Sequence, residues 1–206
     1  MNFQPFPKNT PWRFPRISGL WLVSTALILL ISISGCQSYW VRTKYHIESK
    51  YSPKKRKSHS ARLAPNGGYQ FAQPLPMPLS QSAMASFLSE VEQLRGTRYR
   101  SGGCSPDGFD CSGLVCYLMK RHFGLLLPRS SADMATHGVM ISSTSALQKG
   151  DLLFFSIDGR TIDHVGIVTG WNRFVHAATS GVREDYISSS YYREHFAFGA
   201  RLLIAE

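Results

Sequence analysis

The chain has 206 residues and a formal net charge of +10 at pH 7, and this length fits one domain of ordinary size plus a tail. The positive charge is concentrated near the N-terminus: residues 37–82 carry eight Lys or Arg and one Glu, whereas residues 83–206 carry twelve residues of each sign. A folded nucleic-acid-binding module needs a basic face. The neutral C-terminal part therefore argues against nucleic acid as a partner.

The first 36 residues have the pattern of an export signal that ends in a lipidation site. Basic residues precede an apolar run over 20–33. This run of about 14 residues has the length of a signal h-region and is shorter than the roughly 20 residues of a membrane span. It ends at Ile33-Ser34-Gly35-Cys36, which resembles the lipobox of bacterial lipoproteins. We expect residues 1–35 to be a signal peptide and Cys36 to be lipidated, with an uncleaved anchor as the alternative.

The residues after Cys36 indicate the membrane to which the protein is sorted and the kind of tether that follows the lipid. Residue 37 is Gln rather than Asp, which by resemblance to Gram-negative sorting implies the periplasmic face of the outer membrane, with the lipid as membrane contact. Residues 36–82 contain five Pro, the basic run 54–57 and no lasting apolar period. We expect a flexible basic tether over 36–82, either simply solvated or attracted to anionic lipid or cell-wall carboxylates.

The folded domain is expected over 83–206, where the patterning becomes periodic. Apolar residues at helical spacing predict a helix that ends near Gly96, and a glycine-rich loop follows. A second helix is expected to begin at Cys111, with Asp110 as its N-cap, and to break near Gly124. A short third helix, capped by Ser130 or Ser131, should reach about residue 136.

The period changes to that of strands after Gly150. Strands are expected over 151–156, 164–169 and 173–178, with a further strand within 197–205. Helices followed by antiparallel strands predict an α+β fold, in which the N-terminal helices pack on an antiparallel sheet.

Cys111 is the candidate nucleophile. A helix N-terminus carries about half a positive charge, which favours the reactive thiolate form of a cysteine placed there. The alternative is a buried structural cysteine, the usual state of a free cysteine.

His164 and His176 are the candidate partners of this thiol. If residues 170–172 form a three-residue loop whose last residue is left-handed, Thr169 pairs with Arg173 and both histidines share one face of the sheet. A two-residue loop would separate them. A catalytic role therefore predicts an odd-length loop or a compensating bulge. One imidazole could then exchange a proton with the thiol while the other orients it.

This constellation resembles the NlpC/p60 family of cell-wall peptidases, specifically the lipoprotein murein endopeptidases, which have a minimal papain-like fold. The matching stretches are GTRYRSGG (96–103), PDGFDCSGLV (106–115), LPRSSADM (127–134), LQKGDLLFF (147–155), HVGIVTG (164–170) and FVHA (174–177). The resemblance implies that Cys111 is the nucleophile, His164 the general base and acid, and His176 the orienting third residue. It also implies that Tyr99 hydrogen-bonds near the oxyanion.

The resemblance implies a cysteine endopeptidase that hydrolyses amide bonds in peptidoglycan stem peptides or cross-links through an acyl-enzyme. The D-Ala–diaminopimelate bond is favoured over the γ-D-glutamyl–diaminopimelate bond. A non-catalytic wall-binding scaffold and a transferase acting on a lipid remain alternatives. We expect a monomer without a cofactor. We also expect no metal, because the paired CxxC spacing of a zinc site is missing.

Two further cysteines accompany the candidate nucleophile. Cys104 lies in the loop before it and Cys116 lies within its helix. Both could be small buried fillers. A Cys104–Cys116 disulfide is possible, and a Cys104–Cys111 disulfide would inactivate the enzyme.

Overall fold

The computed structural model describes residues 47–49, 51, 56–65 and 70–206. The expected signal peptide (1–35) and the expected lipidation site, Cys36, lie outside the described residues. Within the described ranges, no helix is long and apolar enough to span a bilayer.

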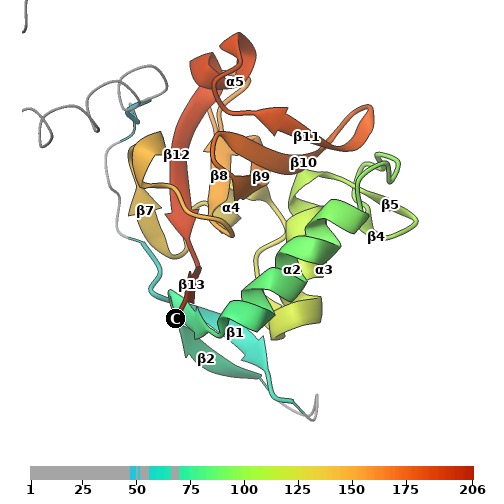
Figure 1. Ribbon diagram of the computed structural model, residues 1–206, viewed down its shortest axis with the longest axis vertical. Helices are drawn as coiled ribbons and strands as arrows, with labels where there is room; N and C mark the ends of the chain where they lie inside the picture. Colours follow the sequence, from blue (N-terminus) through green and yellow to red (C-terminus); the bar gives the residue numbers. More distant parts are fainter. Residues whose placement is uncertain (1–46, 50, 52–55, 66–69) are drawn as a thin grey trace, which may run out of the picture. The chain divides into compact units, whose positions relative to one another are not determined.

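A six-stranded antiparallel sheet forms the centre of the folded part (Figure 1), in the order β11-β10-β9-β8-β12-β7. Its strands are β7 (Val139–Ile141), β8 (Leu152–Phe155), β9 (His164–Gly170), β10 (Arg173–Ala178), β11 (Gly181–Tyr186) and β12 (Phe196–Arg201). The three strands expected after Gly150 are confirmed as β8, β9 and β10. The strand expected within 197–205 is split, because the pairing partner changes at Leu202. β7 and β11 were not predicted.

Helix α3 packs against this sheet, as expected for the α+β class. The helices of the described residues are α2 (Gln81–Gln93), α3 (Cys111–Phe123), α4 (Ser131–Met134), the 3₁₀ helix η1 (Thr144–Ala146) and α5 (Ser190–His195). Helix α3 contacts α2, β9 and β10, and Figure 1 shows α2 and α3 side by side next to the sheet. Leu114 and Leu118 of α3 are fully buried in the shared core. The sheet thereby supports the helix that begins with the candidate nucleophile.

The part of the expected tether that the structure describes is folded, which corrects the sequence analysis. Strand β1 (His59–Leu63) pairs with β2 (Gln70–Pro74) and with β6 (Leu125–Leu126), while β3 (Met77–Leu79) runs parallel to β13 (Leu203–Ala205). Leu75 and Met77 are buried in the main core. Strands β1, β2 and β3 are only three to five residues long, so they give no lasting period. Pairing with distant segments holds them in place, and the folded part begins well before residue 83.

The β9–β10 turn differs in detail from the expected loop. Arg173 pairs with Gly170 rather than with Thr169, so only two residues form the loop, and Asn172 is left-handed with a φ of 60°. The register then shifts between Arg173 and Phe174. This irregularity is the compensating bulge that the sequence analysis required of a two-residue loop. It allows both histidines to occupy the same face.

Candidate active site

Cys111 is the first residue of α3, as the sequence predicted. The Oδ1 atom of Asp110, the N-cap, accepts a hydrogen bond from the amide of Gly113 at 2.8 Å. A Cβ atom on Gly113 would lie 1.9 Å from the carbonyl oxygen of Gly103, so only glycine allows this close approach of helix and loop. The partly buried sulfur of Cys111 faces the carbonyl oxygen of Asp163 at 3.9 Å. The helix start is therefore held directly against the beginning of β9.

Arg129 fixes this helix start from the other side. Its guanidinium donates to both carboxylate oxygens of Asp110, at 2.8 and 2.6 Å, and also to Ser112 Oγ and the carbonyl oxygen of Gly103. Burial alone would raise the pKa of Asp110, but the hydrogen bonds from Arg129 and from two backbone amides lower it below its usual value. Arg129 lies in the stretch LPRSSADM, but no local pattern of the sequence predicts its contact with Asp110.

The Cys111 thiol is less acidic than its position at a helix start suggested. Burial raises the pKa of Cys111, and the nearby charge of Asp110 raises it further, whereas the amides of Val165, Ser112 and Cys111 itself lower it. Burial prevails because an ion loses its hydration there. The resting sulfur is therefore a protonated thiol that needs a base before it can attack.

The two candidate histidines meet as predicted. Nε2 of His164 lies 2.8 Å from Nδ1 of His176. Burial, together with the neighbouring His176, lowers the pKa of His164 to about 3. Burial also lowers the pKa of His176, although Asp185 opposes that shift. Both rings are neutral at pH 7, and a neutral imidazole can accept a proton.

Asp185 and Tyr192 extend this pair, and neither was predicted from the sequence. Nε2 of His176 lies 2.9 Å from Oδ2 of Asp185, and the Tyr192 hydroxyl lies 3.1 Å from the same oxygen. Asp185 belongs to β11 and Tyr192 to α5, neither of which had been predicted. A carboxylate in a short polar run has no local pattern that links it to a histidine nine residues away.

Tyr99 lies on the loop between α2 and β4 (Cys104–Ser105), and its backbone forms an isolated bridge with Phe109 of β5 (Gly108–Phe109). Burial raises the pKa of Tyr99, and the charge of an ionised Cys111 would raise it further. The hydroxyl is therefore protonated at pH 7 and electrostatically coupled to the sulfur. A partly exposed phenol of this kind can donate a hydrogen bond to a substrate oxygen.

The cysteines Cys104, Cys111 and Cys116 are all free, so neither of the possible disulfides is formed in the structure. Cys104 is exposed, while Cys116 is partly buried and directs its thiol at the carbonyl oxygen of Pro128 at 3.5 Å. Burial raises the pKa of Cys116 to about 11. Cys116 thus behaves as the small filler that the sequence analysis considered, whereas Cys104 does not.

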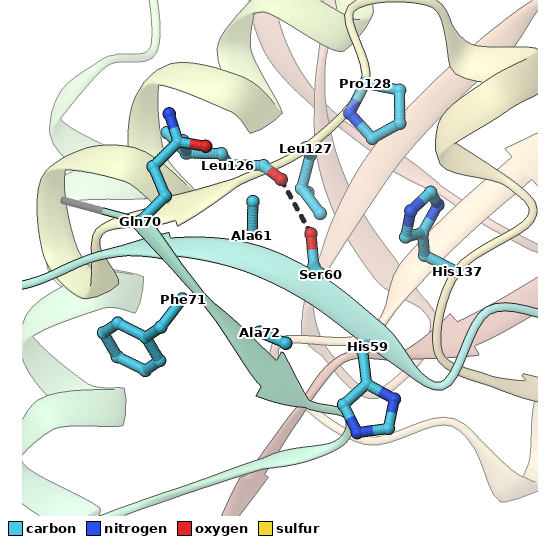
Figure 2. A pocket seen from close by; sticks show the side chains of 10 residues that line it. All are labelled: His59, Ser60, Ala61, Gln70, Phe71, Ala72, Leu126, Leu127, Pro128 and His137. Carbon is cyan, nitrogen blue, oxygen red and sulfur yellow. Dashed lines mark hydrogen bonds between the residues drawn. The ribbon is translucent and has the colours of Figure 1, made fainter.

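A separate hollow of about 550 Å³ lies over β1, β2 and the segment after β6. Figure 2 shows its lining side chains, with the Ser60 hydroxyl donating to the carbonyl oxygen of Leu126 at 2.7 Å. None of the four candidate site residues lines it. In the described part of the chain, no three His, Cys, Asp or Glu side chains gather as a metal-binding group would require.

Residues 96–201 match the NlpC/P60 family. The chain belongs to this family, and the match covers the stretches from Tyr99 through Cys111, His164 and His176. The α+β architecture agrees with this assignment. A crystal structure of an NlpC/P60 family protein from Bacillus cereus ATCC 10987 superposes with a TM-score of 0.55 at 27% identity, covering 75% of this chain and 53% of that one.

Two relatives from Escherichia coli K12 are similar to this chain. Murein DD-endopeptidase MepS/Murein LD-carboxypeptidase is 41% identical over 117 residues, which are 56% of this chain and 61% of that protein. Probable endopeptidase NlpC is 37% identical over 119 residues, which are 57% of this chain and 77% of that protein. The chain thus spans less than two thirds of the length of the first relative.

Proposed function

We propose that the chain is a cysteine endopeptidase that hydrolyses amide bonds of peptidoglycan, with Cys111 as nucleophile and His164 as general base and acid. His176 would orient His164, and Tyr99 would donate to the oxyanion. The observation that carries the proposal is the 2.8 Å contact between the two histidine rings, together with the Cys111 sulfur held 3.9 Å from the carbonyl oxygen of Asp163, the residue before His164. A buried pair of neutral imidazoles beside a thiol is the arrangement that thiol-based acyl transfer uses.

The mechanism follows from the protonation states of the resting site. Because the Cys111 thiol is protonated and His164 is neutral, proton transfer to His164 accompanies the attack of sulfur on the amide carbonyl. The oxyanion would accept hydrogen bonds from the Cys111 amide, one of the amides at the helix start that have no carbonyl partner within the helix, and from Tyr99. His164 then returns the proton to the leaving amine, which departs and leaves a thioester on Cys111.

The second half of the reaction reverses these roles. His164 takes a proton from water as the water oxygen attacks the thioester carbonyl. The tetrahedral intermediate then breaks its C–S bond, and the proton returns to the sulfur. The products are a carboxylate, an amine and the regenerated thiol, so the step needs no cofactor.

We propose the D-Ala–diaminopimelate cross-link as the bond that is cut. Support comes from the similarity to a protein described as a murein DD-endopeptidase. The γ-D-glutamyl–diaminopimelate bond would give different muropeptides, so the masses of the products distinguish the two bonds.

Purified murein sacculi provide the test. The full chain in mild detergent should release new muropeptides from sacculi, and Cys111→Ala should release none. Cys104→Ala is the matched control, because it removes an exposed thiol from a neighbouring loop and should retain activity. Intact sacculi after incubation with the wild type would instead favour a wall-binding scaffold. A modified lipid as the only product would favour the transferase alternative.

We also propose that lipid on Cys36 anchors the protein to the periplasmic face of the outer membrane and that the protein works as a monomer. The lipobox-like residues before Cys36 support the anchor. Cys36→Ala should shift the protein from the membrane fraction to the soluble fraction, and sedimentation in detergent should give the mass of one chain. Retention of the Cys36→Ala protein in membranes would contradict the anchor.

A further inference from the structure

Asp185 closes a line of hydrogen bonds that begins at His164. Nε2 of His164 meets Nδ1 of His176 at 2.8 Å, and Nε2 of His176 meets Oδ2 of Asp185 at 2.9 Å. The ring of His176 is 1% exposed, so water does not compete for its nitrogens. Nδ1 of this ring meets His164, whereas Nε2 meets the Asp185 carboxylate at 2.9 Å and, at the longer distance of 3.2 Å, the Tyr192 hydroxyl, which also donates to Asp185.

An ionised carboxylate can only accept hydrogen bonds, whereas a neutral imidazole has one protonated and one unprotonated nitrogen. Burial raises the pKa of Asp185, but hydrogen bonds from His176 and Arg183 lower it by more, so the carboxylate is ionised at pH 7. Nε2 of His176 must then carry the proton that Asp185 accepts. Nδ1 of His176 must accept from Nε2–H of His164, and Nδ1 of His164 remains unprotonated.

We propose that Asp185 is a positioning residue that sets the tautomers of both histidines, so that Nδ1 of His164 is the free base for the Cys111 thiol. The inference rests on the proposed function, because it assigns the atom that would take the thiol proton. It extends that function by adding a carboxylate from β11 to the two histidines.

The local fold holds Asp185 for this task. In the β10–β11 pair, His176 faces Arg183 and Phe174 faces Asp185, so these four side chains share one face of the sheet. Phe174 stacks on the His176 ring, with centroids 4.9 Å apart. Arg183 donates to Oδ1 of Asp185, and the Tyr192 hydroxyl donates to Oδ2. The carboxylate is thus fixed from two sides while it accepts from His176.

Asp185→Asn should invert the pattern of donors. Arg183 requires an acceptor, so the amide oxygen of the asparagine should occupy the Oδ1 position and direct its NH₂ group at Nε2 of His176. That nitrogen must then accept, and the proton of His176 moves to Nδ1. His164 Nε2 becomes an acceptor in turn, which places the proton of His164 on Nδ1 and blocks the base.

The primary test is ¹⁵N NMR of the histidine rings in the full-length chain in mild detergent, near pH 7, with signals assigned through single histidine substitutions. In the wild type, we expect protonated Nε2 and unprotonated Nδ1 in both rings. Protonated Nδ1 in wild-type His164 would overturn the proposal. This measurement needs no substrate, so it tests the role of Asp185 even if the protein does not cleave peptidoglycan.

Kinetics with sacculi give the second test. Asp185→Asn should lower kcat by about 100-fold, in the range that loss of general acid–base catalysis produces, and should leave KM nearly unchanged.

Glu184→Gln is the matched control. Glu184 neighbours Asp185 but contacts Thr169 and Arg173 instead, so its substitution should change neither tautomers nor kcat. Equal kcat in the folded Asp185→Asn and Glu184→Gln variants would overturn the proposal. A wild type that is inactive on sacculi but has the expected tautomers would instead contradict only the proposed function.

Discussion

Replacing Arg129 by Met tests how the start of α3 is held. The methionine keeps an apolar stem but removes the guanidinium, which donates two hydrogen bonds to Asp110 and one each to Ser112 and Gly103. Hydrogen bonds to a charged group contribute roughly 1.5–3 kcal/mol each. The Arg129 side chain is 44% exposed, so water compensates for part of the loss. We expect the free energy of unfolding to fall by about 2 kcal/mol, measured by urea denaturation.

The same substitution should make the Cys111 thiol less acidic. The charge of Asp110 already raises the pKa of Cys111, and Arg129 neutralises part of that charge. The alkylation profile of Cys111 should therefore shift to higher pH in Arg129→Met, as followed by iodoacetamide labelling and peptide mass spectrometry. Mass analysis of the Cys111 peptide separates its reaction from that of the exposed Cys104.

Arg129→Lys is the control that keeps the positive charge but removes the planar guanidinium group. A lysine cannot bridge both oxygens of Asp110 in the same way, so its unfolding free energy should lie between those of wild type and Arg129→Met. Its Cys111 profile should shift less. This reasoning would be refuted if the free energy of unfolding of Arg129→Met lay within about 0.5 kcal/mol of the wild-type value and the pH profile of Cys111 alkylation were unchanged.

Three further changes test the surrounding framework. Arg201→Met should lower the unfolding free energy by about 3–5 kcal/mol, because it leaves Asp151, which is 0% exposed, without the guanidinium that lies 2.8 Å away; adding Asp151→Asn should recover much of the loss. Gly166→Ala should lower both stability, by about 1–3 kcal/mol, and sacculus cleavage, because its Cβ would lie 2.5 Å from the Phe174 ring. The native pKa of His164, about 3, lies below the unfolded value of about 6.5. Between these pH values the unfolded chain binds one more proton than the native protein. The free energy of unfolding, measured in urea, should therefore fall by on the order of 4 kcal/mol in total as pH falls, and His164→Gln should reduce this dependence.

Much of the site was predictable from the sequence because its signals are local. An aspartate before the first residue of an apolar-periodic helix predicts an N-cap, and Asp110 caps α3 as expected. The alternation of β9 and β10 predicts that His164 and His176 share a face if the turn is odd or bulged, and they do. Caps, helical period and strand period each depend on residues within a few positions of one another.

The sequence by itself determined the helix start at Cys111, the hairpin that joins the two histidines and the α+β class. Only the tertiary structure decided that Arg129 clamps Asp110 and that Asp185 reaches His176. It also decided that residues 56–65 and 70–79 contribute strands. These features depend on contacts between side chains of different elements or on strands too short to show a period. The burial of Cys111 was also decided by the tertiary structure. Its position at a helix start favours an acidic thiol, but the packed core around it excludes water and raises the pKa of Cys111.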